Sequence, residues 1–180
     1  FSKALSDWVS KGNTLITIGT GSSWVVNTKF VKEKLIKVVP DSTTLTSRKP
    51  YVDAGENIGR EALGGVFLKG DMDLSHPLGF GYDQSRVALY KNNEVWLAPS
   101  KSAYGTVIDY AEKPHLDGYI SEKNQREFLP KSASLIVSPK GMGRVIMFAD
   151  NPNFRGIHYG MNRLFLNAIF LGNHIEVPSE

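Results

Sequence analysis

Residues 145–149 form an apolar run, Val-Ile-Met-Phe-Ala, without the alternation of a half-exposed strand. Such a run is typical of a strand that is covered on both faces, because neither of its sides meets water. A helix is expected over residues 159–171, where apolar residues recur at helical spacing: Met161, Leu164, Phe165, Ala168 and Ile169. A doubly covered strand followed by an amphipathic helix predicts helices packed on a sheet, which is an α/β architecture.

The N-terminal part has a similar order of elements. The end of an amphipathic helix is expected at 2–9, and a strand rich in β-branched residues at 14–18. A glycine turn at 19–23 and a helix from Trp24 to about Phe30 follow, which together make half of a strand–helix–strand unit.

The middle of the chain predicts an antiparallel hairpin, with strands at 86–90 and 94–98 around the turn Lys91-Asn92-Asn93. Further elements are expected as strands at 66–68, 106–110, 134–137 and 144–149, and as a helix at 121–128. We therefore expect a three-layer α/β sandwich with a mostly parallel sheet and one antiparallel hairpin. It would be a single domain over 1–172, followed by a solvated tail at 173–180.

Composition excludes several classes of protein. The chain has 180 residues and no cysteine, so disulfides, thiolate zinc sites, iron–sulfur clusters and a cysteine nucleophile are excluded. Its apolar runs are far shorter than the roughly 20 residues of a membrane-spanning helix. The 21 lysine and arginine residues are spread along the sequence, and the net charge is only +3, so no clustered basic face for nucleic acid is expected.

Motifs for known chemistries are incomplete. None of the four histidines precedes a glutamate by three residues, so a zinc hydrolase site is not expected. The serine elbow Gly-x-Ser-x-Gly is absent; Ser22 and Ser23 could be nucleophiles, but the following helix favours a capping role. Gly19-Thr20-Gly21 could cradle a phosphate, although Trp24 stands where the dinucleotide motif needs its third glycine.

Two further clusters have ordinary explanations. Asp71, Asp73 and His76 could hold a cation, but aspartate and its neighbours here also suit a turn. His174 and Glu176 resemble an acid–base pair but fall in the expected tail. We therefore predict no catalytic residue, no metal and no cofactor in this chain.

The best candidate for a binding site is the crevice at the carboxyl end of the strand 144–149, where open α/β sheets place their ligands. The residues expected to contact a small polar ligand, peptide or glycan there are Gly19, Gly21, Ser22, Asp150, Asn151, Asn153, Arg155 and His158. In the alternative reading, Asp150 and Asn153 tie the turn and cap the next helix, and Arg155 pairs with a carboxylate.

Several of these segments resemble a known family. Residues 12–21 resemble the nucleophile-elbow strand of class I glutamine amidotransferase-like domains, and 143–152 resemble their late strand with the catalytic histidine. Residues 73–82, 98–100, 118–121 and 148–172 look like the C-terminal domain of large zinc carboxypeptidase-like proteins of Bacteroidetes-type bacteria, most specifically at 148–155. The resemblance implies a flavodoxin-like fold over most of the chain.

The departures from that family affect the expected function. The elbow cysteine would fall at about Gly19, the catalytic histidine at about Asp150 and its glutamate at Pro152. Because glutamine hydrolysis needs a thiolate and a base, these replacements imply a scaffold without the reaction. The resemblance thus implies a non-catalytic accessory domain, with zinc held by an upstream metallopeptidase domain and export to the periplasm or cell surface.

That resemblance also implies partners. The upstream catalytic domain of the same protein would be the main one, and a second copy of the chain, in a homodimer, would be the other. The family fold has a strand and a helix before the elbow strand, so we expect upstream residues to complete the sheet beside 14–18.

Overall fold

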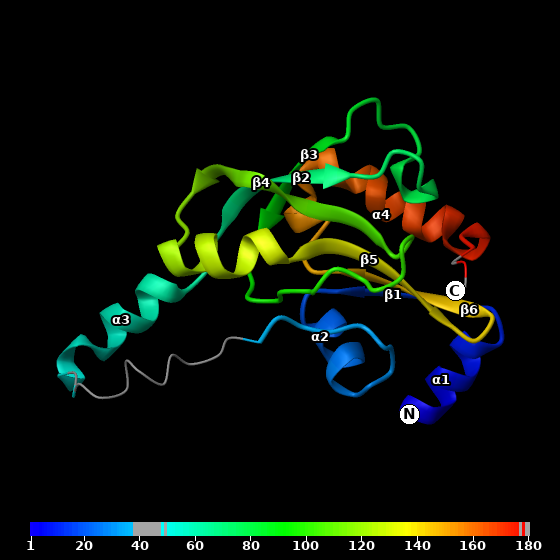
Figure 1. The fold of residues 1–180 in the computed structure, drawn as a ribbon, viewed down its shortest axis with the longest axis horizontal. Coiled ribbons are helices and arrows are strands. Elements are labelled where there is room, and N and C mark those ends of the chain that lie inside the picture. The colour runs from blue at the N-terminus through cyan, green and yellow to red at the C-terminus, as the bar shows by residue number, and fades with distance from the viewer. Residues whose placement is uncertain (38–47, 49, 177, 179–180) are drawn as a thin grey trace.

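The computed structural model describes residues 1–37, 48, 50–176 and 178. In this part of the chain, six strands form one sheet in the order β1-β6-β5-β4-β2-β3 (Figure 1). Their bounds are β1 Thr14–Ile18, β2 Val66–Met72, β3 Arg86–Lys91, β4 Thr106–Gly118, β5 Ala133–Lys140 and β6 Gly143–Phe148. Strands β1 and β3 are the two edges of the sheet.

The sheet is mixed, so the expectation of a mostly parallel, flavodoxin-like three-layer sandwich is wrong. Among the described strands, β1 and β6 are the one parallel pair, and the other four pairings are antiparallel. The reason lies in the connections. Gly141, with φ at +62°, closes a tight turn between β5 and β6, and such turns join antiparallel strands.

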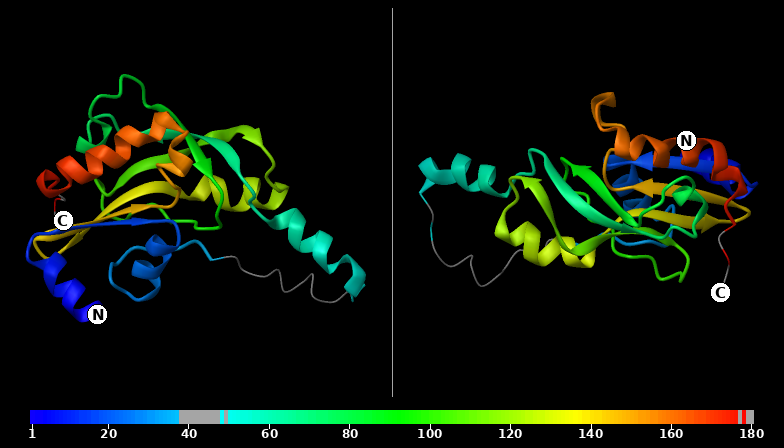
Figure 2. Two further views of the ribbon diagram at one scale, coloured as in Figure 1. Left: turned by 180° about the vertical axis from the view of Figure 1, so that it is seen from behind. Right: turned by 90° about the horizontal axis from the view of Figure 1, so that it is seen from above.

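The sheet also curls into a half-barrel (Figure 2). Strand β4 is 13 residues long, and its register shifts against both β2 and β5. Bulges of this kind bend a strand and increase its twist, which explains why the sheet departs from a flat layer.

Helices cover both faces of the sheet. Helices α1 (Ser2–Ser10) and α2 (Thr20–Asn27) pack on one face, and α4 (Tyr159–Leu171) packs on the other (Figure 2). Helix α3 (Ala54–Glu61) extends away from the sheet (Figure 1). Short helical turns are η2 Tyr51–Asp53, η3 Pro77–Gly79, η4 Asn124–Phe128, η5 Leu129–Lys131, η6 Phe154–Gly156 and η7 Gly172–His174.

Strand β6 confirms the prediction of a strand covered on both faces. Val145 and Met147 pack in the core under α1 and α2, whereas Ile146 and Phe148 pack in the core under α4. All four side chains are at most 1% exposed. This strand therefore belongs to both hydrophobic cores and fixes the sheet between the two helical layers.

Three local predictions are corrected. Residues 94–98 are not the partner of β3, which pairs with β2; instead Leu97 bridges Leu35 and Ala133. Helix α2 begins at Thr20 rather than Trp24, because Gly19 at φ +53° turns the chain sharply out of β1. The expected tail is partly structured, since Ile175 is 1% exposed and packs in the core under α4. Residues 177, 179 and 180 of that tail lie outside the described residues.

No helix within the described residues combines the length and the apolar character that crossing a membrane requires.

Candidate functional site

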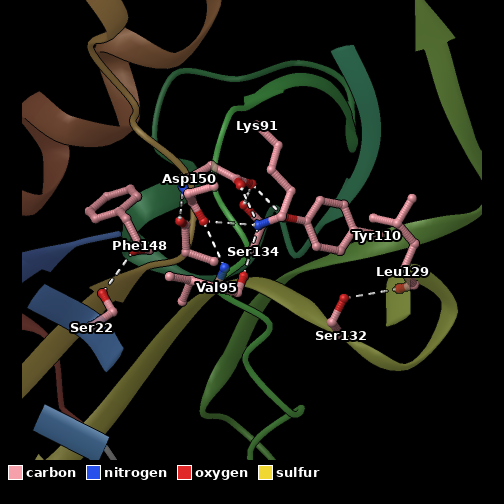
Figure 3. A network of polar contacts seen from close by, with 11 residues as sticks. Ser22, Lys91, Val95, Tyr110, Leu129, Ser132, Ser134, Phe148 and Asp150 are labelled. Carbon is pink, nitrogen blue, oxygen red and sulfur yellow. Dashed lines mark hydrogen bonds and ion pairs between the residues drawn. The ribbon is translucent and has the colours of Figure 1, made fainter. Parts of the chain in front are cut away.

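A buried polar network lies at the carboxyl end of β6, where the sequence predicted a binding crevice (Figure 3). Asp150, the second residue after β6, accepts three hydrogen bonds through its carboxylate. The ammonium of Lys91 lies 3.1 Å from Oδ1, and the hydroxyls of Tyr110 and Ser134 each lie 2.6 Å from Oδ2. Both carboxylate oxygens are therefore engaged by side chains of β3, β4 and β5.

Lys91 is the centre of this network. Its side chain is fully buried, and its ammonium also donates to the backbone oxygen of Val95 at 2.8 Å. The same nitrogen lies 4.5 Å from the ring centroid of Trp96, a cation–π contact. Burial lowers the pKa of Lys91, and the charge of Asp150 opposes that shift.

Tyr110 is held in its neutral form. Burial, followed by the charge of Asp150, raises the pKa of this phenol well above 10.0. It therefore stays a hydrogen-bond donor to Asp150 at every ordinary pH. The carboxylate of Asp150 has its charge balanced by the ammonium of Lys91, and both of its oxygens accept hydrogen bonds. The arrangement therefore suits joining strands better than binding a ligand.

Asn93 covers the network from the side of the glycine turn. Its amide nitrogen donates to the backbone oxygen of Ala149 at 2.9 Å, and its amide oxygen accepts from the backbone nitrogen of Val95 at 2.9 Å. A Cβ placed on Gly19 would lie 3.8 Å from the same amide nitrogen. The loop after β3 thus occupies the space beside Gly19 that the sequence assigned to a ligand.

Ser22 is neither an exposed nucleophile nor a helix cap. Its side chain is fully buried, and its hydroxyl donates to the backbone oxygen of Phe148 at 2.8 Å (Figure 3). The hydroxyl of Thr17 lies 3.0 Å from the hydroxyl of Ser22. A Cβ placed on Gly21 would lie 3.7 Å from the Cβ of Thr17, which is an ordinary van der Waals contact. These contacts fix α2 against β1 and β6.

The other predicted ligand residues point elsewhere. Asn151 accepts from the backbone nitrogen of Asn153 at 3.0 Å, so the side chain of Asn151 ties this turn, and not those of Asp150 and Asn153 as the alternative expected. Arg155 is exposed at φ +50°, and its guanidinium lies over the ring of Phe154. His158 lies 2.9 Å from the backbone oxygen of Ala88, against the edge of the sheet. Gly19 and Ser22 thus bond the end of β6 two residues before Asp150, whereas the contacts of Arg155 and His158 are with Phe154 and with β3.

Asp71, Asp73 and His76, the residues considered for a cation, have partners within the chain. Asp73 accepts from the backbone nitrogen and the hydroxyl of Ser75, and Asp71 pairs with Arg86 at 3.6 Å. His76 accepts from the backbone nitrogen of Leu78 at 3.1 Å. Among the residues with described positions, no three His, Cys, Asp or Glu side chains are arranged to hold a metal ion.

Two surface features were not anticipated from the sequence. One is a pocket of about 690 Å³ that is lined by lysines from three separate segments. The other is the outer face of α4, where Leu166, Ile169 and Phe170 are 49%, 50% and 72% exposed. The pocket depends on long-range folding, because its lysines are far apart in sequence. The exposed residues of α4 lie beside its buried stripe, so their exposure depends on how much of the helix the sheet covers.

The network residues that sequence reasoning missed are Lys91, Tyr110 and Ser134. The sequence predicts Lys91 in a hairpin turn, and Tyr110 and Ser134 in strands. The one signal is that each of these residues lies at or next to an end of a predicted strand.

Comparison with known proteins identifies no relative: no family model, no curated protein and no solved structure matches this chain.

Proposed function

We propose that this chain is a non-catalytic interaction domain and that it docks a partner domain on the outer face of α4. The observation that carries the proposal is the exposure of that face. Tyr159, Leu166 and Phe170 recur at i, i+7 and i+11, which places them on one side of a helix, and they are 79%, 49% and 72% exposed. Ile169 extends the surface beside them.

The chemistry of the helix supports a covered surface. A helix that faces water normally carries charged residues on its outer side, and one that is apolar all round is normally buried. Helix α4 has one charged residue, Arg163, among 13. Its guanidinium bonds the backbone oxygen of Gly81 and lies 5.6 Å from the ring of Tyr82, so it is held by the neighbouring loop.

The same loop adds to the surface. Asn167 is a buried residue of α4, and its amide donates to the backbone oxygens of Leu78 and Phe80. These hydrogen bonds fix the loop to the helix. The Phe80 ring is 72% exposed. An aromatic and aliphatic surface on a rigidly held helix and loop is the composition found at the centres of stable interfaces between proteins.

The partner we propose is a neighbouring domain of the same polypeptide. The resemblance to the C-terminal domains of zinc carboxypeptidase-like proteins supports this choice, and it would make the chain an accessory domain of an exported bacterial metallopeptidase. The buried Lys91–Asp150 pair supports the non-catalytic part of the proposal, since these groups serve the fold.

Thiol labelling tests the proposal cleanly, because the chain has no cysteine of its own. We expect Leu166→Cys to react with a thiol reagent as fast as Glu122→Cys, an exposed control away from α4, when the chain is studied alone. When the upstream domain is attached, Leu166→Cys should slow by about tenfold or more, because each 1.4 kcal/mol of covering contact gives a factor of ten.

Two outcomes would contradict the proposal. Equal labelling of Leu166→Cys with and without the upstream domain would mean that the face stays uncovered. Protection that appears in the isolated chain and grows with its concentration would show that a second copy covers the face. The Glu122→Cys control must keep the same rate in every sample.

A further inference from the structure

A pocket of about 690 Å³ lies on the side of the sheet that carries α1 and α2. Three stretches of chain and the end of α1 form its wall, namely residues 29–34, 98–102, 138–141 and Ser10. Its volume falls within the range of about 300–1,000 Å³ that is typical of sites for small organic ligands. It is separate from the Lys91–Asp150 network and from the outer face of α4.

The pocket is strongly basic. Its lining includes five lysines but one acidic residue, and the lysines are Lys29, Lys32, Lys34, Lys101 and Lys140. Within the described part of the chain, none of the five forms an ion pair. The acidic residue, Glu33, already accepts a hydrogen bond from the Ser100 hydroxyl at 3.0 Å. The pocket therefore concentrates positive charge in a chain whose net charge is only +3.

The lining between the lysines is apolar. Phe30 and Val31 are 6% and 7% exposed, and Ala98, Pro99 and Pro139 line the same pocket. Lys140 is fixed over this surface, because its ammonium donates to the backbone oxygen of Phe30 at 2.7 Å and lies 4.4 Å from the ring centroid. An apolar wall with ammonium groups around it matches a ligand that is itself half apolar and half anionic.

One residue of the pocket wall, Ser102, carries a buried hydroxyl. The Ser102 oxygen is buried and makes no hydrogen bond within the described residues. Leaving a buried polar atom unsatisfied costs free energy, so a bound acceptor would remove that cost. Lys29, a non-glycine residue at φ +57°, ends helix α2, since the backbone nitrogens of Lys29 and Phe30 bond the oxygens of the last helical turn, and this bend leads the chain into the pocket wall.

We propose that this pocket binds a small amphipathic anion, a molecule with an apolar body and a carboxylate, phosphate or sulfonate group. The lysines attract the anionic group, the Ser102 hydroxyl donates to it, and the apolar body packs on Phe30, Val31 and Pro99. Lysine ammoniums are compact point charges, so they suit a single anionic group without demanding bidentate geometry.

The fluorescent probe anilinonaphthalene sulfonate has this chemistry, and its neutral parent, phenylnaphthylamine, is the matched control. We expect saturable binding of the sulfonate at one site, and binding of the neutral parent that is weaker by about tenfold or more, because the charge contacts are lost. Lys34→Met should weaken sulfonate binding by roughly two- to fivefold, and Lys34→Met with Lys101→Met by roughly the product of two such changes.

Ser102→Ala separates a binding role from a structural one. Removing a hydroxyl that makes no hydrogen bond to the part of the chain that the structure describes should leave the melting temperature unchanged or raise it. If the hydroxyl donates to the ligand, the same change should weaken sulfonate binding by about two- to tenfold. Lys113→Met, an exposed lysine on β4 outside the pocket, removes the same charge and should leave sulfonate binding unchanged.

Three results would overturn the proposal. The neutral parent could bind as tightly as the sulfonate, or the pocket variants could bind no worse than Lys113→Met. Alternatively, Phe170→Glu on α4 could abolish the fluorescence, which would place the probe on the outer face of that helix. None of these readouts depends on whether the α4 face docks a partner domain, so the two proposals fail independently.

Discussion

Replacing Lys91 with methionine is expected to destabilise the native chain by about 3–5 kcal/mol, which is the cost of leaving one member of a buried ion pair without its partner. Methionine keeps most of the side-chain volume, so little cavity forms. The loss falls on Asp150, which is 1% exposed and would be left with only the hydroxyls of Tyr110 and Ser134 as donors. Unfolding in urea, with a shift of the midpoint at constant slope, measures this change.

A second variant shows whether the unpaired charge is the cause. Adding Asp150→Asn to Lys91→Met removes the charge, while the amide oxygen can still accept from Tyr110 or Ser134. This double variant should recover more than half of the lost stability, and Lys113→Met on the surface should stay within about 0.5 kcal/mol of the unchanged chain. A cost below about 1 kcal/mol for Lys91→Met alone would refute the structural role of the pair.

Gly143→Ala is expected to cost about 3 kcal/mol, at the upper end of the range for overpacking. Gly143 is the first residue of β6 and is buried against the connection between α1 and β1. A Cβ there would overlap the backbone oxygens of Val9 and Asn13, and it would lie 3.0 Å from the backbone nitrogen of Asn13. Backbone atoms cannot rotate away, so the strand or the helix end must shift.

Gly59→Ala provides the matched control for the same change. Gly59 lies in α3, and a Cβ placed there meets nothing within 4 Å. Alanine is preferred to glycine in a helix by up to about 1 kcal/mol, so this variant should be neutral or slightly stabilised. Thermal unfolding of both variants compares them, and a Gly143→Ala midpoint as high as that of Gly59→Ala would rule out the close approach.

The local elements were more predictable than the way in which they pair. The apolar run of β6 and the helix α4 are present because burial on two faces and a helical stripe leave direct periodic signals. Hydrophobic periodicity does not show strand direction, although the short connection between 137 and 144 already favours an antiparallel pair there. The tight turn at Gly141 makes β5 antiparallel to β6, and β4 pairs antiparallel with both β2 and β5.

The stripe on α4 was only partly right. Met161, Leu164 and Ala168 are buried as expected, but Phe165 is half-buried and Ile169 is 50% exposed. Helical spacing indicates which residues share a face, yet it cannot set how wide a strip the sheet covers. On a helix with a single charged residue, the boundary between covered and exposed apolar positions depends on tertiary packing alone.

The candidate site was also only partly predictable from the sequence. The position of Asp150 at the end of β6 was predictable from its place after an apolar run. Its partner was not, because Lys91 is 59 residues away and follows a strand whose expected partner was 94–98. The lysine pocket was hidden for a similar reason, since its charges look evenly spread until three segments fold together.

The reactivity of Lys91 toward reductive methylation tests most directly whether the polar groups at the strand ends serve the fold. A lowered pKa favours the neutral amine, which is the reactive form, so Lys91 would react readily if reagent could reach it. We predict that mass spectrometry of the native, ligand-free chain finds Lys34 and Lys113 methylated while Lys91 stays unmodified until the chain unfolds. Methylation of Lys91 at the rate of these exposed lysines would show that the crevice opens to solvent and would contradict the account.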